Sequence, residues 1–441
     1  MEKKLNLFDL ISIGIGVIIG AGVFSVMGYG IAYTGRSIVL ALMVSMILVI
    51  LQSIREPILA NIFVLDGGTY GFNALLCPRW MTGVYAANDV IFKLGTQSVT
   101  ALAFVEYLAI LIPALANCKV VAAIVVLSVA MVLQVFGNKA VARVQNVMCI
   151  MMYIALALFV VFGFIHIDPS AYAGEPFMIN GITGFMMAAA LMSYTCNGFQ
   201  YLVNLTKSAE NPKRNIPLSF VLSALIAAGI YAVIGFAATH TNSYADIAGH
   251  SLGDISKLFM PTGLSMYFIV GGALFALGTS LVGGMASCYQ PLVASSSDGW
   301  LPSALAKYTK KGHVSYALIF LYMIGVVVLI LGFDLNDFIT MSLVPLAVVT
   351  LISNLFSLSA PERFSAQWKE SGVKVSSGLY KLLLILGCIA SAILGGYCFL
   401  SNDFKLITVI LVAVIFVYGL TMNKFGHIRI HAQEEYKENV Q

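Results

Sequence analysis

The stretch Gly14–Phe24, which reads GIGVIIGAGVF, lies inside an apolar run over residues 10–33. At a rise of about 1.5 Å per residue, an α-helix of that length crosses the roughly 30 Å of hydrocarbon in a bilayer. Glycines weaken a helix interior, and Gly20 and Gly22 flank the single residue Ala21. A helix that ends and restarts here exposes N–H and C=O groups at membrane depth, where such groups need a partner or a ligand. The alternative is that these glycines only let helices pack closely.

The composition indicates a polytopic membrane protein. Of 441 residues, 60% are hydrophobic and 10% are charged, and the mean hydropathy is +0.93, which excludes a soluble multidomain protein. The net charge of +4 does not indicate a nucleic-acid partner. The seven cysteines are scattered, so neither a disulfide framework nor a zinc site is expected. No HExxH, Walker A or GxSxG pattern appears, and we expect no enzymatic activity.

Apolar stretches of spanning length predict twelve transmembrane helices in a single domain over residues 1–441. They cover residues 9–33, 37–63, 81–112, 119–137, 144–166, 180–205, 216–239, 264–294, 314–333, 337–358, 378–400 and 403–422. Twelve spans place both termini on one side of the membrane. That side carries eighteen Lys and Arg residues against four on the other, so the positive-inside rule predicts cytoplasmic termini. Residues 424–441 are expected to form a cytoplasmic tail, and its polar end HAQEEYKENVQ, residues 431–441, is expected to be frayed.

A second interruption is expected in the sixth span. The run that begins at Ser193 starts inside an apolar helix and continues with Thr195, Cys196, Asn197 and Gly198. Asn-Gly is a strong turn signal, which is unusual at membrane depth. The two interruptions are five spans apart, as an inverted repeat of five plus five helices requires. This spacing favours a transporter with two broken helices over the alternative in which the glycines only allow helices to pack closely.

The sequence resembles the amino acid–polyamine–organocation (APC) family, and within it the L-amino-acid transporter branch. Over about residues 5–360, the motifs that carry the resemblance are GVIIGAGVF, DGGTYGFNALL, TQSVTALAFVEYL, ARVQN, ENPKRNIP and SSSDGWLPSALAKY. The resemblance implies an all-α, leucine-transporter-like fold in which helices 1 and 6 are broken. The inverted repeats would cover residues 6–168 and 178–360, with peripheral helices 11 and 12 at residues 375–423.

The resemblance also implies a substrate site at the two breaks. The substrate carboxylate would bind the backbone N–H groups of Gly20, Ala21 and Gly22, because a helix N-terminus offers donors and a positive dipole. The ammonium would bind backbone carbonyls drawn from Ile18, Ile19, Tyr194 and Thr195. Selectivity is expected from the side chains and backbone of Thr96, Cys196, Asn197 and Gly198. Tyr194 matches the family's aromatic lid, and the alternative for it is an ordinary core tyrosine.

Helices 5 and 8 bear on ion coupling. Many sodium-independent members carry a lysine in helix 5, but the matching residue here is Met152, whose thioether cannot replace a cation. Thr279 and Ser280 in helix 8 are adjacent hydroxyls, and with helix 1 carbonyls near Ala21 they would suit a sodium ion. The alternative to sodium coupling is that both hydroxyls bond back to the preceding helical turn.

Charged residues within the spans are expected to pair. Asp89 and Lys93 are four residues apart in the third span, so they share a helix face. We favour a structural ion pair; the alternatives are that Lys93 recognises an acidic substrate or that Asp89 relays a proton. Arg55 and Glu56 in the second span are expected to pair with each other.

Together these observations predict a secondary transporter of small neutral L-amino acids, such as alanine, serine or threonine. It would work by alternating access, as an exchanger or an ion-coupled symporter. The alternatives are a sodium-coupled carrier of larger neutral or acidic amino acids and, in another class, a sensor or a channel. We expect a bacterial cell-membrane protein with no obligate protein partner and no cofactor other than a sodium ion.

Overall fold

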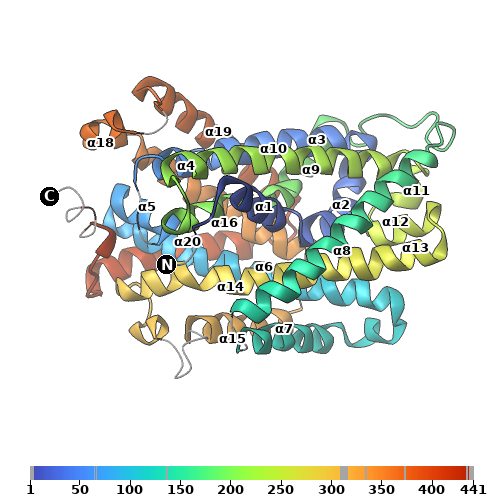
Figure 1. Cartoon of the computed structure of the whole chain (residues 1–441), viewed down its shortest axis with the longest axis horizontal. Coiled ribbons are helices and arrows are strands. Elements are labelled where there is room, and N and C mark those ends of the chain that lie inside the picture. The colour runs from blue at the N-terminus through green and yellow to red at the C-terminus, as the bar shows by residue number, and fades with distance from the viewer. Residues whose placement is uncertain are drawn as a thin grey trace.

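The computed structural model describes residues 4–63, 65, 67–135, 138–307, 316–332, 335–371, 374–433 and 436. Within these ranges the chain is built from helices without any β-strand, and a single bridge pairs Leu5 with Ala209. Most long helices run along the longest axis of the molecule (Figure 1). The prediction of an all-α polytopic membrane protein is therefore confirmed.

The helices up to the second predicted interruption are α1 (Leu7–Ile18), α2 (Ala21–Thr34), η1 (Gly35–Ser37), α3 (Ile38–Gln52), α4 (Arg55–Ala60), α5 (Gly68–Leu76), α6 (Arg79–Leu111), η2 (Pro113–Cys118), α7 (Lys119–Val135), α8 (Asn138–Ile165) and α9 (Gly181–Cys196). Those that follow are η3 (Phe199–Ser208), α10 (Pro212–Thr239), α11 (Tyr244–Ile247), α12 (Leu252–Phe259), α13 (Thr262–Tyr267), η4 (Phe268–Leu274), α14 (Phe275–Ser297), η5 (Ser303–Ala306), α15 (Tyr316–Ile330), α16 (Leu335–Ser357), α17 (Ala360–Arg363), α18 (Ser365–Lys369), α19 (Ser377–Ser401) and α20 (Lys405–Phe425).

Length and apolar composition make many of these helices suitable for crossing a membrane. In the described ranges, nine helical segments meet both conditions, and the shorter apolar helices α1 and α15 add to them. Helices occupy each of the twelve stretches predicted from the sequence. The number of crossings itself stays a prediction.

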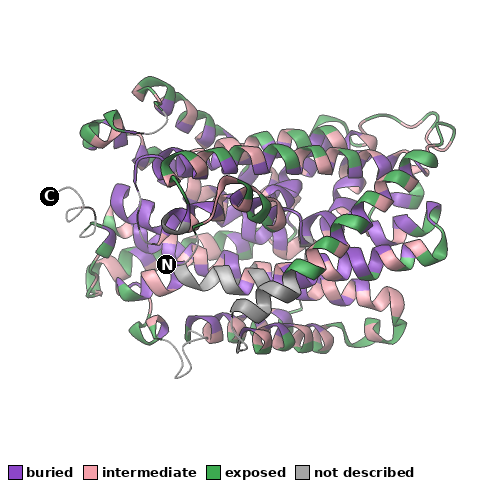
Figure 2. Cartoon of the chain, viewed as in Figure 1, coloured by how far each residue is buried: buried purple, intermediate pink, exposed green. Residues whose placement is uncertain are grey.

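The core is built around the first interruption. The helix α2 packs against α9, α1 packs against α10, and α6 packs against α14, α16 and α20. Buried residues gather between these helices, whereas exposed residues lie on outward faces (Figure 2). The largest buried apolar cluster contains Ile18, Ile19, Phe24, Met152 and Cys196. Two predicted site segments therefore lie inside one packed core.

The start of α1 and the end of α20 lie toward the same end of the molecule (Figure 1). We call this end the terminal face; it is formed by the start of α1 and the end of α14. The opposite end, which carries α11, α12 and the start of α7, is called the far face. The shared side of the first and last described helix ends agrees with an even number of crossings.

The expectation of a frayed tail is wrong for residues 431–433, and the preceding residue Arg429 is also bonded. The Arg429 N–H donates to the Asp298 carbonyl at 2.9 Å, and the side-chain amide of Gln433 donates to the Ala74 carbonyl at 3.0 Å. The Asp298 carboxylate accepts the His431 N–H at 3.1 Å. The tail is ordered because acceptors at the ends of α14 and α5 satisfy its polar groups.

Candidate functional site

The first interruption lies where the glycines predict it. The helix α1 ends at Ile18 and α2 begins at Ala21, and Gly20 between them has a backbone conformation that is neither helical nor extended (φ −148°, ψ −135°). The Ile19 N–H still bonds to the Ile15 carbonyl at 2.8 Å, which completes the last turn of α1. The first N–H groups of α2 have no intrahelical partner, so the positive end of its dipole faces the gap.

The second interruption follows Cys196, where α9 ends, and the chain resumes as the 3₁₀ helix η3 at Phe199. Gly198 has a φ of 130°, which residues with a Cβ rarely adopt. Gln200 closes this break, because its side-chain oxygen accepts the Gly198 N–H at 2.8 Å and its amide donates to Asn197 Oδ1 at 2.5 Å. Sequence reasoning missed Gln200, although a polar residue two positions after Asn-Gly inside an apolar run was a usable signal.

The two breaks lie against each other. A methyl group placed on Gly22 would meet the Thr195 Cα at 2.7 Å, and one placed on Gly198 would meet the Val17 carbonyl oxygen at 3.1 Å. Both glycines therefore permit a close approach of backbone to backbone. Residues 17–22 and 194–198 contain no charged side chain. The gap is lined by peptide groups and neutral side chains.

A tyrosine that sequence reasoning missed connects the two breaks. The Tyr231 hydroxyl, on α10, lies 2.7 Å from the Ile18 carbonyl oxygen and 3.3 Å from the Thr195 carbonyl oxygen, and its ring is fully buried. A phenol has one proton, so the two carbonyls share it. Both belong to the set expected to receive a substrate ammonium. Tyr231 lies in the apolar part of α10, residues 224–238, and nothing local in the sequence marks it.

Tyr194 and Thr96 lie together. The Tyr194 hydroxyl interacts with the side chains of Thr96 and Thr100 on α6, and the Thr100 hydroxyl also donates to the Thr96 carbonyl at 2.7 Å. The predicted lid and one predicted selectivity residue thus form one wall. Cys196 is not part of this wall, because its thiol faces the Leu42 carbonyl on α3 at 4.0 Å.

The Thr195 hydroxyl indicates where a ligand could bind. It is buried and finds no hydrogen-bond partner among the described residues. It lies 2.9 Å from the position of a methyl group on Gly22, so it faces the first break. An unsatisfied buried hydroxyl costs about 1–3 kcal/mol, and such groups usually find water or a ligand.

The residues considered for ion coupling are Ala21, Met152, Thr279 and Ser280, and Ser280 lies against Gly20. A methyl group on Gly20 would collide with the Ser280 hydroxyl oxygen of α14. The Thr279 hydroxyl donates to the Ala276 carbonyl at 2.8 Å, which is the hydrogen bond to the preceding turn that was the alternative to sodium coupling. This bond uses the hydroxyl proton and leaves the two lone pairs of the oxygen for another partner. Met152 is fully buried in the same cluster as Ile18. The Ala21 side chain lies outside the described part of the structure.

Both predicted ion pairs are present. The Lys93 ammonium lies 2.6 Å from the Asp89 carboxylate, and the Arg55 guanidinium lies 2.9 Å from the Glu56 carboxylate. With Asn197, the residues Asp89, Arg55 and Glu56 line a cavity of about 50 Å³ on the terminal side of the second break. Arg55 Nε and Glu56 Oε2 have no partner among the described residues. The cavity is a polar space next to the breaks.

Comparison with known proteins adds the family. A family model described as amino acid permease matches residues 5–424. The chain belongs to the amino acid permease family. The branched-chain amino acid permease BcaP of Bacillus subtilis (strain 168) is 23% identical to this permease over 383 residues, which are 82% of this chain and 79% of that protein.

Two further relatives are named for other substrates. The methylthioribose transporter of Bacillus subtilis (strain 168) is 22% identical over 326 residues, which are 70% of each chain. Cationic amino acid transporter 5 of Arabidopsis thaliana is 23% identical over 300 residues, which are 64% of this permease and 52% of that protein. The predicted APC membership is confirmed, and this permease is an amino acid transporter in a membrane and not an enzyme.

Proposed function

We propose that this permease carries small neutral L-amino acids, such as alanine, serine or threonine, by alternating access. The N–H groups of Gly20, Ala21 and Gly22 would hold the carboxylate at the start of α2. The ammonium would bind carbonyls of the two breaks, drawn from Ile18, Ile19, Tyr194 and Thr195. Residues 6–168 and 178–360 would form the two inverted repeats, with the helices at 375–423 outside them.

The observation that carries this proposal is the contact of the two breaks at Gly22 and Thr195. An amino acid zwitterion needs donors and acceptors close together, and a broken helix beside a second broken helix supplies both from the backbone. A neutral substrate side chain suits the gap because Asp89 and Lys93 already neutralise each other. A small one suits the wall made by Tyr194 and Thr96.

Uptake into proteoliposomes tests the substrate. Vesicles loaded with unlabelled alanine are diluted into labelled alanine, with sodium or potassium as the only cation. We expect labelled alanine to accumulate, and unlabelled serine and threonine to compete with it at lower concentrations than leucine, arginine or glutamate. Preferred competition by leucine or arginine would overturn the small neutral assignment. Binding of alanine without any uptake would indicate a sensor.

We also propose that the terminal face is cytoplasmic and that the protein lies in a bacterial cell membrane. The excess of Lys and Arg on that side supports this orientation. Cys118 is exposed at the far face, and Phe425 at the end of α20 is 73% exposed. A membrane-impermeant maleimide should label Cys118 on intact cells, whereas Phe425→Cys in a Cys118→Ser background should be labelled only after lysis. The reverse pattern would invert the topology.

Sodium coupling is a second candidate, supported by the Ser280 hydroxyl beside Gly20. Hydroxyl and carbonyl oxygens at the end of α1 and in α14 are suitable ligands for a hard cation. If sodium binds there, Thr279→Ala should remove the stimulation of alanine uptake by sodium while uptake in potassium stays the same. A wild-type rate that is equal in sodium and potassium would exclude this candidate.

A further inference from the structure

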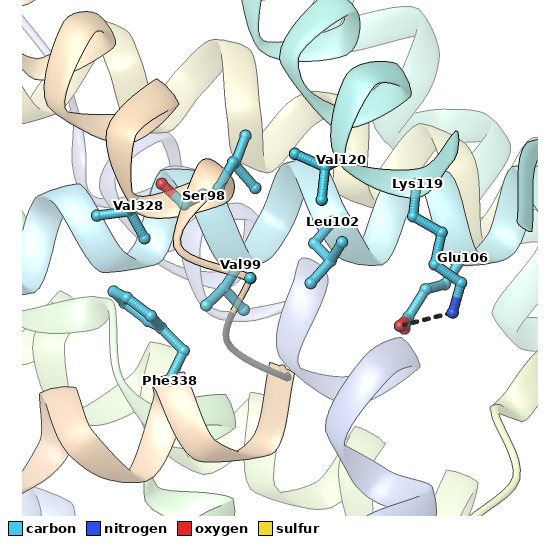
Figure 3. A pocket seen from close by; sticks show the side chains of 10 residues that line it. Ser98, Val99, Leu102, Glu106, Lys119, Val120, Val328 and Phe338 are labelled. Atoms are coloured by element: carbon cyan, nitrogen blue, oxygen red, sulfur yellow. Dashed lines mark ion pairs between the residues drawn. The ribbon is translucent and has the colours of Figure 1, made fainter. Parts of the chain in front are cut away.

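A groove separate from the two breaks lies between α6, α7, α15 and α16. Its volume is about 210 Å³, and its apolar lining consists of Val99, Leu102, Val120, Val328, Leu329 and Phe338. Figure 3 shows these side chains converging on one space, with Lys119 and Glu106 at one end. The Ser98 hydroxyl donates to the Gly325 carbonyl at 3.0 Å and joins α6 to α15 at the other end.

The groove is nearly as long as the hydrocarbon layer of one leaflet. Glu106 and Ser98 are eight residues apart on α6, so the groove descends about 12 Å at the helical rise of 1.5 Å per residue. One leaflet of a bilayer contributes roughly 15 Å of hydrocarbon. The flanking helices face the membrane, since Val121 and Val125 of α7 and Val327 of α15 are each more than half exposed. An acyl chain in the leaflet next to the far face can therefore enter between them.

The charged end of the groove has the chemistry of a zwitterionic headgroup. Lys119 begins α7 and Glu106 lies near the end of α6, so both are at the membrane–water boundary. Their nitrogen and oxygen are 3.8 Å apart, and the side chains are 45% and 32% exposed. A long, exposed ion pair of this kind contributes little to stability, so a ligand can separate the two groups at small cost.

We propose that this groove binds one acyl chain of a phosphatidylethanolamine, with the lipid ammonium on Glu106 and the lipid phosphate on Lys119. A primary ammonium donates hydrogen bonds to a carboxylate, whereas the quaternary ammonium of phosphatidylcholine cannot. Phosphatidylglycerol has no cation for Glu106. The bound chain joins α15 and α16 to α6, and the lipid therefore stabilises the folded transporter. This site does not depend on which amino acid is carried.

Thermal unfolding in vesicles tests the site. The purified full chain is reconstituted in phosphatidylglycerol vesicles that contain an equal share of either phosphatidylethanolamine or phosphatidylcholine. We expect the unfolding midpoint to be about 2–4 °C higher with phosphatidylethanolamine, as a ligand bound only by the folded state produces. Equal midpoints in the two lipids would overturn the proposal.

Variants separate the headgroup from the chain. Glu106→Gln should abolish the difference between the two lipids, and Leu102→Trp, which fills the groove, should do the same. The matched control is Lys257→Gln, which breaks an exposed ion pair with Asp254 at 3.0 Å elsewhere on the far face and should keep the difference. If the preference for phosphatidylethanolamine survives in Glu106→Gln, or is lost in Lys257→Gln, the groove does not recognise the lipid headgroup through Glu106.

Discussion

At the residue scale, Gly22 decides whether the two breaks can touch. Its missing Cβ would lie 2.7 Å from the Thr195 Cα, which is backbone and cannot rotate away. Overpacking of this kind costs about 1–3 kcal/mol, so we expect Gly22→Ala to lower alanine uptake about tenfold or more. The control is Gly229→Ala on α10, where a methyl group meets nothing within 4 Å. Equal uptake by the two variants at equal membrane levels would contradict the close approach.

Tyr231 gives a second prediction at this scale. Its hydroxyl supplies the proton that the Ile18 and Thr195 carbonyls share, and removing it leaves buried acceptors unsatisfied at a cost of about 1–3 kcal/mol. We expect Tyr231→Phe to reduce alanine uptake about tenfold in proteoliposomes. Tyr316→Phe, at a tyrosine that is 45% exposed, should leave uptake unchanged. Full activity of Tyr231→Phe would mean that the breaks hold each other without this hydroxyl.

At the element scale, the two halves of the broken first helix are held to different degrees. Carbonyls along α2 accept hydrogen bonds from the Tyr107 hydroxyl at 2.6 Å, the Gly249 N–H at 3.0 Å, the Tyr244 hydroxyl at 2.7 Å and the Asn180 amide at 3.0 Å. By contrast, α1 exposes Ser12 and Ile13, and Val17 beside the break is 42% exposed. In α1, the Ile11 and Ile18 carbonyls accept hydrogen bonds from the Ser223 hydroxyl at 3.3 Å and the Tyr231 hydroxyl at 2.7 Å, so among the described residues α2 is held by more of these bonds than α1.

Tyr107 tests this asymmetry. Its hydroxyl donates to the Phe24 carbonyl, and losing one such bond, at about 1 kcal/mol, shifts a two-state equilibrium roughly fivefold. Met27 of α2 is fully buried, so Met27→Cys in a Cys118→Ser background reports opening of the far side. We expect Tyr107→Phe to raise its labelling by a membrane-impermeant maleimide on intact cells about fivefold.

The control for that prediction is Tyr267→Phe. The Tyr267 hydroxyl also donates to a carbonyl, that of Met151 on α8 at 3.1 Å, and its hydrogen bonds in the described part of the structure do not involve α2. Labelling of Met27→Cys should stay at the wild-type rate in this variant. If Tyr107→Phe and Tyr267→Phe raise the labelling of Met27→Cys equally, the cause is a general loosening of the helix packing and not the release of α2.

The two breaks could be predicted from sequence because their causes are local. Glycines at 20 and 22 and an Asn-Gly turn at 197 and 198 weaken a helix whatever surrounds them. Tyr231 could not be predicted, because its partner Ile18 is 213 positions away and the chain holds twenty tyrosines. The Asp89–Lys93 pair, four residues apart, needed only the helical period. Contacts within one helical turn could therefore be predicted from local patterns. Contacts between helices either came from the family resemblance, as for the two breaks, or were missed, as for Tyr231.

At the scale of the whole molecule, the tail crosses the terminal face and joins distant elements. The Asp298 carboxylate, only 3% exposed, accepts the Tyr70 hydroxyl at 2.6 Å and the His431 ring nitrogen at 2.5 Å. Further along, the Tyr436 ring packs edge-on against Phe63 and Phe364, with centroids 5.9 Å and 5.1 Å apart. The polar composition of the tail predicts solvation, because composition alone does not show that the buried Asp298 carboxylate at the end of α14 binds the tail.

Removing the tail should therefore destabilise the protein. A chain that ends at Gly426 leaves Asp298 without the His431 N–H and ring, and each hydrogen bond to a charged group contributes about 1.5–3 kcal/mol. We expect the thermal midpoint in vesicles to fall by about 5 °C or more. A chain that ends at Tyr436 keeps every tail contact described above and should retain the wild-type midpoint. Asp298 and Phe63 lie in different predicted repeats, so the tail links the two repeats and should restrain their relative motion. The shorter chain should therefore exchange alanine faster per folded molecule. A slower rate would show that the tail supports the transport cycle and does not restrain it.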